Sequence, residues 1–302
     1  MKSAYADLGG RVHHVDFGGA PDGPPVVLVH GLGGSHLNWT RLAPLLTPYA
    51  RVSALDLAGF GRTGAQAGPT TVSANAVLLR RYLTEVVGEP AVLVGNSMGG
   101  MVSTLAAASA PELVKGLALV DPSIPLAPGA KIDPQVRLRF AVNLIPGLAG
   151  WVLRRRIATL PARQRVAETL DMTCADRSRV PEEVIAAAVA LDEEMTRDHP
   201  ARAASYLEAS RSLLRLLARP TAYWRAMESL PMPVLLVHGV HDRLVGIAQA
   251  RAAAARLPHW TYVELDSGHV PQLEHPLELS EHLLSWTASS LRSPTERHHL
   301  GT

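Results

Sequence analysis

The stretch LVGNSMGGMV, residues 93–102, places a serine where an apolar run meets a pair of glycines. The run before the serine is typical of a buried strand, and the residues after the glycines are typical of a helix. Gly95, Ser97 and Gly99 fit G-x-S-x-G, in which the serine occupies a sharp, strained strand-to-helix turn with its hydroxyl exposed. Flanking glycines leave room where strand and helix close together. The alternative is a glycine-rich turn whose serine is incidental or caps the helix.

Short β-branched runs alternate with helical stretches on both sides of this turn. The predicted strands are residues 11–17, 25–31, 51–57, 91–96, 114–121, 233–242 and 261–269, and predicted helices include 38–49, 71–88, 246–257 and 276–291. Nearly continuous apolar strands that alternate with helices predict an α/β fold, with a mostly parallel central sheet and helices on both faces.

The strand pattern stops between residues 123 and 230, where the chain is a series of predicted helices with proline near several of their starts. We therefore expect a core built from residues 1–122 and 231–291, with a helical lid at 123–230. The lid would lie over the carboxyl ends of the strands and shape a substrate pocket. Residues 292–302 are expected to be a disordered tail.

The composition narrows the classes of function. The chain has 302 residues with 29 basic and 27 acidic side chains, so a net charge of +2 argues against nucleic acid as a partner. Cys174 is the single cysteine, which excludes an internal disulfide and a metal site built from cysteines. The N-terminus lacks a signal-peptide core, and no run of about 18 apolar residues occurs. A soluble, cytoplasmic monomer or homodimer is expected.

Two further residues would complete a nucleophilic set with Ser97. Asp242 follows the predicted strand 233–242, and His269 follows the strand 261–269. Both lie just past the carboxyl ends of strands, where an open parallel sheet binds its ligands. The order Ser97, Asp242, His269 is the one associated with this type of serine turn.

The chain resembles the α/β-hydrolase superfamily through five motifs that span nearly its whole length: HGLGG (30–34), DLAGFGRT (56–63), GNSMGG (95–100), HGVHD (238–242) and GHVPQLEHP (268–276). The resemblance implies the α/β-hydrolase fold, with the helical lid inserted after its sixth strand. It implies Ser97 as nucleophile, His269 as base and Asp242 as orienting acid, with the backbone N–H groups of Leu32 and Met98 as oxyanion hole.

Several residues compete for these roles. Asp121 follows the preceding strand and is the second candidate for the acid, although the context HGVHD favours Asp242. His241 is the second candidate for the base. Asp56 is expected to hold its own loop, with Arg62 as partner, and His30 is expected to be structural. The expected reaction needs no metal and no organic cofactor.

Serine at position 97 argues against epoxide hydrolases and haloalkane dehalogenases, which resemble this chain but attack through aspartate. Hydrolysis of carboxylic esters of a small to medium apolar substrate, through an acyl-enzyme, is the leading interpretation. A C–C bond hydrolase of ring-cleavage products is the second interpretation. It is disfavoured because that group usually has an aromatic residue where this chain has Val270. A cofactor-free perhydrolase remains open on the same triad, and a non-enzymatic ligand receptor is disfavoured because all three residues are present.

The expected lid contains FAVNLIPGLAGWVLRRR (140–156), an apolar run that ends in three arginines. One interpretation is contact with a lipid surface, so the lid is the only expected place of membrane contact. The favoured interpretation is an amphipathic helix that covers the pocket with Arg154, Arg155 and Arg156 in solvent, because Pro146 and Gly147 break the run.

Overall fold

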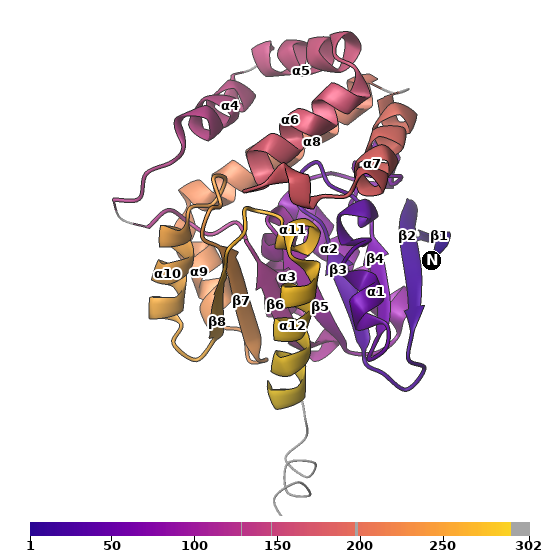
Figure 1. The fold of residues 1–302 in the computed structure, drawn as a ribbon, viewed down its shortest axis with the longest axis vertical. Coiled ribbons are helices and arrows are strands. Elements are labelled where there is room, and N and C mark those ends of the chain that lie inside the picture. Colours follow the sequence, from indigo (N-terminus) through magenta and orange to yellow (C-terminus); the bar gives the residue numbers. More distant parts are fainter. Residues whose placement is uncertain (128, 146, 197–198, 291–302) are drawn as a thin grey trace, which may run out of the picture.

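An eight-stranded sheet with the order β1-β2-β4-β3-β5-β6-β7-β8 runs through the molecule (Figure 1). The structure is a computed structural model that describes residues 1–127, 129–145, 147–196 and 199–290, so the expected tail at 292–302 lies outside the described residues. Strands β1 and β2 pair antiparallel, β2 pairs antiparallel with β4, and the other neighbours are parallel. The mostly parallel sheet is thereby confirmed. The strands are β1 (Lys2–Asp7), β2 (Arg11–Gly19), β3 (Pro25–Val29), β4 (Arg51–Leu55), β5 (Ala91–Asn96), β6 (Val114–Val120), β7 (Val234–Gly239) and β8 (Thr261–Leu265).

Alternate side chains of the central strands enter two separate cores, because successive residues of a strand point to opposite faces. In β3, for example, Val27 and Val29 join the core on one face of the sheet, and Val26 and Leu28 join the core on the other. This double burial explains why these strands have nearly continuous apolar sequences.

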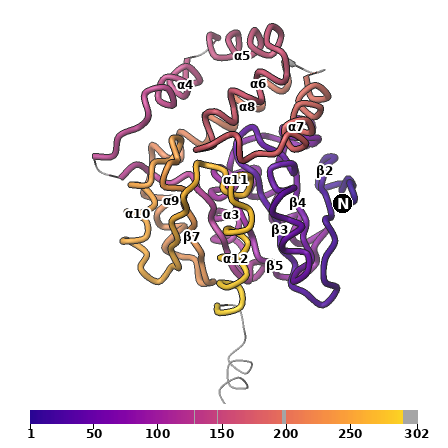
Figure 2. The backbone as a smooth tube through the Cα atoms, in the orientation of Figure 1, coloured from indigo at the N-terminus to yellow at the C-terminus, as the bar shows by residue number. Residues whose placement is uncertain are grey.

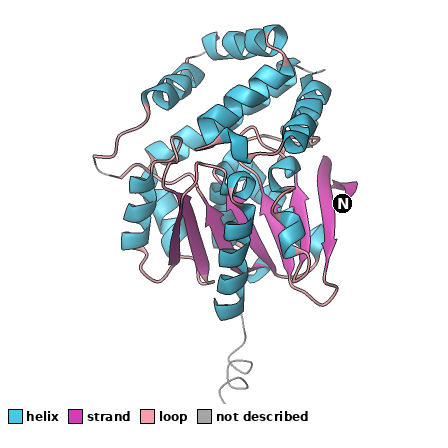
Figure 3. Cartoon of the chain, viewed as in Figure 1, coloured by secondary structure: helices cyan, strands magenta, loops and turns pink. Residues whose placement is uncertain are grey.

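Helices cover both faces of the sheet, as predicted (Figure 3). Residues of α1 (Ala43–Leu46) and α12 (Pro276–Ser290) pack in one core. The other core contains residues of α2 (Val72–Tyr82), α3 (Met98–Ser109), α9 (Pro220–Glu228) and α10 (Ile247–Arg256). The shorter elements are α11 (Pro271–Glu274), the 3-10 turns His36–Trp39, Ala65–Ala67, Pro111–Leu113 and Arg177–Arg179, and a π-helical turn at Leu83–Val87.

Two local features differ from the sequence-based prediction. The predicted helix 38–49 is a 3-10 turn followed by the one-turn helix α1, because Pro44 has no N–H with which to continue a helix. The edge strand β1 was not predicted. Its sequence KSAYAD is largely exposed and lacks an apolar run, so its pairing with β2 is the feature that defines it.

Five helices lie above the carboxyl ends of the strands (Figure 2). They are α4 (Pro134–Leu144), α5 (Leu148–Thr159), α6 (Ala162–Thr173), α7 (Glu182–Met195) and α8 (His199–Ala218), and they follow β6 in the chain. Helix α9, which also belongs to the helical segment between β6 and β7, packs beside α3 at the level of the sheet.

The turn between β5 and α3 lies at the switch point of the sheet. Strand β3 is flanked by β4 and β5, so the connections after β3 and β5 leave on opposite sides and open a crevice at their carboxyl ends. The β5–α3 turn approaches β3 so closely that a Cβ atom on Gly99 would lie 2.2 Å from the carbonyl oxygen of Val29. Glycine at this position is therefore a packing requirement.

We predict that Gly99→Ala destabilises the protein by about 2–4 kcal/mol, because backbone on both sides must move to admit the methyl group. Gly150→Ala is the matched control, since its Cβ would meet first the flexible end of Arg154 within helix α5, where alanine is favoured. Urea unfolding of both variants checks this prediction. Equal unfolding midpoints for Gly99→Ala and the parent protein would contradict it.

Candidate active site

Ser97 occupies the strained turn that its motif predicts. Its backbone angles are φ 56° and ψ −121°, and its hydroxyl makes no capping hydrogen bond to α3, which argues against the N-cap alternative. The strain is held by the backbone: the Ser97 N–H donates to the Val120 carbonyl at 3.1 Å, and the Ser97 carbonyl accepts from the N–H groups of Gly100 and Ser123 at 3.0 and 3.1 Å. The half-buried side chain lines the main cavity.

Asp242 and His269 meet beside this turn. They follow β7 and β8, and the His269 Nδ1 lies 2.7 Å from the Asp242 Oδ2. The other Asp242 oxygen accepts the N–H groups of Leu244 and Val245 at 2.7 and 3.0 Å, which fixes the carboxylate. A proton on Nδ1 that is donated to Asp242 leaves Nε2 as the acceptor of the imidazole. Ser97, Asp242 and His269 all line the same cavity.

Asp121 lies behind Asp242 and is fully buried. Its Oδ1 accepts the Gly239 N–H at 2.7 Å, while its Oδ2 has no hydrogen-bond partner among the described residues. Burial, and then the nearby charge of Asp242, raise the pKa of Asp121 well above its ordinary value. Burial also opposes ionisation of Asp242, but the charge and hydrogen bond of His269 hold the pKa of Asp242 below its ordinary value. The two carboxyl groups thus differ: the surroundings of Asp242 favour its ionised form, whereas those of Asp121 disfavour ionisation.

The two residues expected to form the oxyanion hole flank Ser97. Met98 is the first residue of α3, so its N–H has no acceptor within the helix. Leu32 follows Gly31 in the loop after β3 and lines the cavity. A Cβ on Gly31 would lie 2.9 Å from the Ser97 Cβ, so this loop passes directly beside the serine. His241, the second candidate for the base, instead lies exposed and contacts Asp266 at 2.8 Å.

Three residues that the sequence did not single out hold His269 in place. Its backbone N–H donates to the Thr173 carbonyl at the end of helix α6, at 2.6 Å, and its carbonyl accepts from Asn96 Nδ2 at 3.0 Å. The buried Glu274 accepts the Gly268 N–H at 2.8 Å, and its other oxygen accepts the N–H groups of Ala175 and Asp176, each at 2.9 Å. Glu274 belongs to the motif GHVPQLEHP, and this carboxylate within an apolar turn was the available signal.

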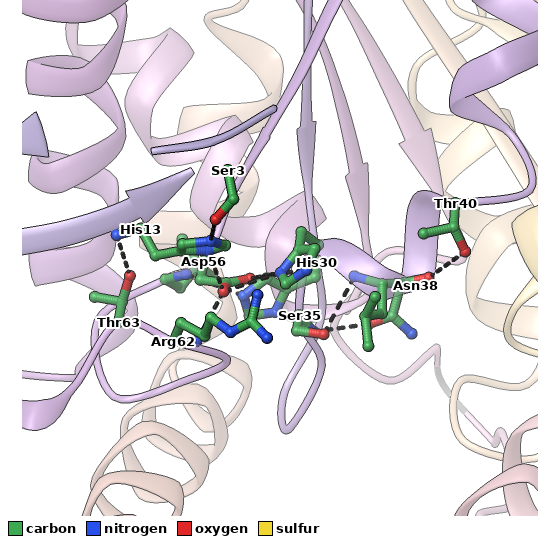
Figure 4. A network of polar contacts seen from close by, with 12 residues as sticks. Ser3, His13, His30, Ser35, Asn38, Thr40, Asp56, Arg62 and Thr63 are labelled. Carbon is green, nitrogen blue, oxygen red and sulfur yellow. Dashed lines mark hydrogen bonds and ion pairs between the residues drawn. The ribbon is translucent and has the colours of Figure 1, made fainter. Parts of the chain in front are cut away.

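A second buried carboxylate, Asp56, connects the loops around the site (Figure 4). It accepts from His13 Nδ1 at 2.8 Å, from His36 Nδ1 at 3.0 Å, and from the backbone N–H groups of His36 and Arg62 at 2.7 and 2.8 Å. Burial opposes its ionisation, but the hydrogen bonds from the two histidines hold the pKa of Asp56 far below its ordinary value. The expected partner Arg62 contributes its backbone, and its guanidinium pairs with Glu194 of helix α7.

The expected structural role of His30 matches its surroundings. Its Nδ1 donates to the Gly31 carbonyl at 2.8 Å, and its Nε2 accepts the Leu57 N–H at 3.0 Å. Burial lowers the pKa of His30, so the ring is neutral and can serve as donor and acceptor at once. The loop that carries Leu32 is held by these two bonds.

The Asp56 network also contains the residue types of a catalytic triad. The Ser3 hydroxyl lies 2.7 Å from His13 Nε2, while His13 Nδ1 contacts Asp56. Ser3, however, is an exposed residue of edge strand β1, in ordinary extended backbone and away from any helix N-terminus. Two clusters, His13–His36–Asp56 and Asp121–Asp242–His269, have ligand atoms close enough for a metal ion. In both clusters imidazole N–H groups donate to the carboxylates, which is the chemistry of a hydrogen-bonded network.

The cavity at the site has a volume of about 970 Å³ and lies between the strand ends and the helices above them. Its lining is mainly apolar and includes Phe60, Ile124, Val136, Phe140, Leu153, Ile157, Val184, Leu213 and Leu217. Charged side chains also line it, among them Arg139, Arg156, Arg165, Asp192 and Arg202. A mainly apolar cavity that also presents polar groups is the usual form of a small-molecule site.

Comparisons with known proteins agree with this geometry. A family model described as the alpha/beta hydrolase fold matches residues 24–276. The chain is 31% identical over 256 residues to a pimeloyl-[acyl-carrier protein] methyl ester esterase of Aromatoleum aromaticum, which covers 84% of this chain and 94% of that protein. Cfl2 from Burkholderia cenocepacia has a similar crystal structure, with a TM-score of 0.75, 25% identity, and coverage of 94% of this chain and 95% of that one.

A further similarity is confined to part of the chain. The dihydrolipoyllysine-residue acetyltransferase component of the acetoin cleaving system of Cupriavidus necator is 39% identical over 120 residues. That match covers 39% of this chain and 31% of that protein, so the chain spans less than a third of that relative's length.

We predict that Asp56→Asn lowers the free energy of unfolding by about 3–5 kcal/mol at pH 7, because a buried charged network loses its acceptor. Folding lowers the pKa of Asp56 from the ordinary 3.8, so its stabilisation is complete above that pH and declines as the pH falls below it. The difference between variant and parent should therefore shrink below pH 3.8.

Urea unfolding at pH 7 and at low pH measures this difference, and Asp22→Asn at an exposed site is the control for loss of charge. A variant that is as stable as the parent at pH 7 would refute the role assigned to Asp56.

Proposed function

This chain belongs to the α/β-hydrolase family and is an enzyme that acts on ester bonds, and we propose that it is a serine hydrolase working through an acyl-enzyme. The observation that carries this proposal is the contact of His269 Nδ1 with Asp242 at 2.7 Å, beside a serine with φ 56° that lines the same cavity. An oriented base in the same cavity as a serine on a strained turn is the arrangement expected of an activated serine hydroxyl.

In the mechanism that we propose, His269 Nε2 accepts the Ser97 proton as the serine oxygen attacks the ester carbonyl carbon. Asp242 holds the proton on Nδ1 and stabilises the imidazolium. The protonated His269 then donates its proton to the departing alcohol, and the acyl group remains on Ser97. A water molecule, deprotonated by His269, then attacks the acyl carbon, and His269 returns that proton to the Ser97 oxygen as the acid is released.

We propose that the N–H groups of Leu32 and Met98 hold the oxyanion that forms in each step. Donors of this kind are each worth about 3–4 kcal/mol of transition-state stabilisation. The positive end of α3 lies at the same place and favours negative charge there. The nucleophile, base, orienting acid and oxyanion donors all come from the chain itself.

For the substrate, we propose carboxylic esters with a small to medium apolar group. The apolar lining of the 970 Å³ cavity supports this class, and the Aromatoleum relative is named for a methyl ester of a pimeloyl group. We also propose that α4 to α8 form the lid, a narrower segment than residues 123–230, because α9 packs with α3 beside the sheet. The hydrogen bond from His269 to Thr173 couples this lid to the proposed base.

We predict that Ser97→Ala abolishes hydrolysis of p-nitrophenyl esters and labelling by a fluorophosphonate probe, while the protein keeps its fold by circular dichroism. Ser3→Ala is the matched control, since Ser3 also contacts a histidine that is paired with an aspartate. This control should keep full labelling. Labelling that survives Ser97→Ala and disappears with Ser3→Ala would contradict the proposal and identify Ser3 as the nucleophile.

We predict that Asp242→Asn lowers kcat by about 10⁴-fold, because asparagine cannot hold the required tautomer of His269. The Asp121 carboxyl group accepts the Gly239 N–H and makes no hydrogen bond to His269, so Asp121→Asn should change kcat by less than about tenfold. Steady-state kinetics of the two variants on one p-nitrophenyl ester gives the comparison. The reverse order of effects would make Asp121 the orienting acid.

A further inference from the structure

The outward side of α4 and α5 exposes a group of large apolar side chains, which we call the outer lid face. Leu138 is 67% exposed and Trp151 is 53% exposed. The other members are Leu144, Ile145, Leu148 and Val152, which are between 37% and 54% exposed. Soluble proteins rarely gather so many exposed apolar side chains on two neighbouring helices unless the surface has a partner.

The clearest stripe of this face lies on α5, where Leu148, Trp151 and Val152 are spaced by one helical turn. Leu138 and Leu144 lie on α4, and Ile145 follows the end of that helix. Their neighbours Val136, Ala149 and Ile157 are buried, so each helix has an inner apolar face as well. Helices α4 and α5 form the layer farthest from the sheet (Figures 1 and 2).

The charge of the same segment has one sign. Residues 134–159 contain five arginines and no aspartate or glutamate. Arg137, Arg154 and Arg155 are exposed, and no carboxylate pairs with them among the described residues. Arg155 lies over the ring of Trp151, 5.3 Å from its centroid, so cation and aromatic side chain are presented together.

We propose that the outer lid face docks the enzyme on an anionic lipid surface. Apolar side chains with interspersed arginines and a tryptophan match the acyl boundary and the charged headgroups of such a surface. A second copy of this chain is a poorer partner, because two outer lid faces would bring Arg137, Arg154 and Arg155 of each copy together without a carboxylate. Both α4 and α5 thus expose apolar side chains. This exposure favours the lipid-contact interpretation of the segment over the interpretation in which its whole apolar face covers the pocket.

The docking that we propose is at the surface of the lipid. No single helix of the described residues is long and apolar enough to cross a membrane. Helices α4 and α5 have sufficient length and composition only as a pair, and they meet at 113°. An amphipathic helix pair of this kind can lie in the interface with its apolar face in the acyl boundary.

The outer lid face is continuous with the mouth of the cavity. Leu126, Ile132 and Leu144 line the cavity and are also 54%, 38% and 54% exposed. Docking would present this mouth to the lipid. The substrate class would then include apolar esters that partition into the lipid, an inference that rests on the proposed ester hydrolysis. Docking itself needs no catalysis, and it can be measured on Ser97→Ala protein if the proposed hydrolysis fails.

The test is co-sedimentation of the full chain with vesicles of phosphatidylglycerol or of phosphatidylcholine. We expect binding to the anionic vesicles, with little binding to phosphatidylcholine, and a blue shift of the tryptophan fluorescence that is lost when Trp151 is replaced. The double variants Arg154→Ala/Arg155→Ala and Leu138→Ser/Trp151→Ser should each lower the partition coefficient at least tenfold. Their turnover of a water-soluble p-nitrophenyl ester should stay at the parent level, because none of the four residues lines the cavity.

The matched controls remove the same number of arginine or apolar side chains from other parts of the surface. Arg251→Ala/Arg256→Ala removes two exposed arginines of α10, and Tyr49→Ser/Leu277→Ser removes two apolar side chains that are 61% and 65% exposed. Both controls should bind vesicles like the parent. Absence of binding to anionic vesicles, or equal loss in patch and control variants, would overturn the proposal. A protein that fails to bind vesicles but forms a dimer or captures an acidic carrier protein is the other outcome. If Leu138→Ser/Trp151→Ser abolished that association, the face would be assigned to that partner.

Discussion

The strained backbone of Ser97 is the constraint on which the site depends. A left-handed conformation is unfavourable for serine and persists only because its surroundings determine it. Those surroundings are the hydrogen bonds of Ser97 to Val120, Gly100 and Ser123, and the absence of a side chain at Gly99, which touches β3. The same close approach of β3, β5 and α3 brings the Leu32 loop beside the serine and fixes where an oxyanion could be held.

Three buried aspartates lie around this turn. The number of hydrogen-bond donors that each carboxyl group accepts influences whether its ionised form is favoured. Asp56 accepts from two imidazoles and two backbone N–H groups, and Asp242 accepts from His269 and two backbone N–H groups, so both are stabilised as anions. Asp121 accepts one backbone N–H and lies near Asp242, so its ionisation is disfavoured. Similar burial therefore leaves two carboxyl groups whose ionisation is favoured and one whose ionisation is disfavoured.

The residues that recur as motifs at strand ends could be predicted from the sequence. Ser97, Asp242 and His269 each follow an apolar strand, and parallel strands bring their carboxyl ends to one edge of the sheet. The residues that hold His269 could not be predicted in the same way, because Thr173 and Glu274 act through contacts between segments about a hundred residues apart. Strand β1 likewise depends on pairing, and the break at Pro44 shows proline overriding an otherwise helical pattern. The exposure of the outer lid face depends on how α4 and α5 pack. An apolar sequence alone does not decide whether its side chains face the pocket or the surface.

We propose that Ser97 becomes acylated by an ester with the help of His269 and Asp242. Acylation can be followed by the pre-steady-state release of p-nitrophenol from a p-nitrophenyl ester, combined with mass spectrometry of protein quenched during the burst. We expect a burst of about one equivalent per chain and an added acyl mass on the peptide that contains Ser97. Turnover without an acyl adduct on Ser97, or an adduct on Ser3, would contradict it.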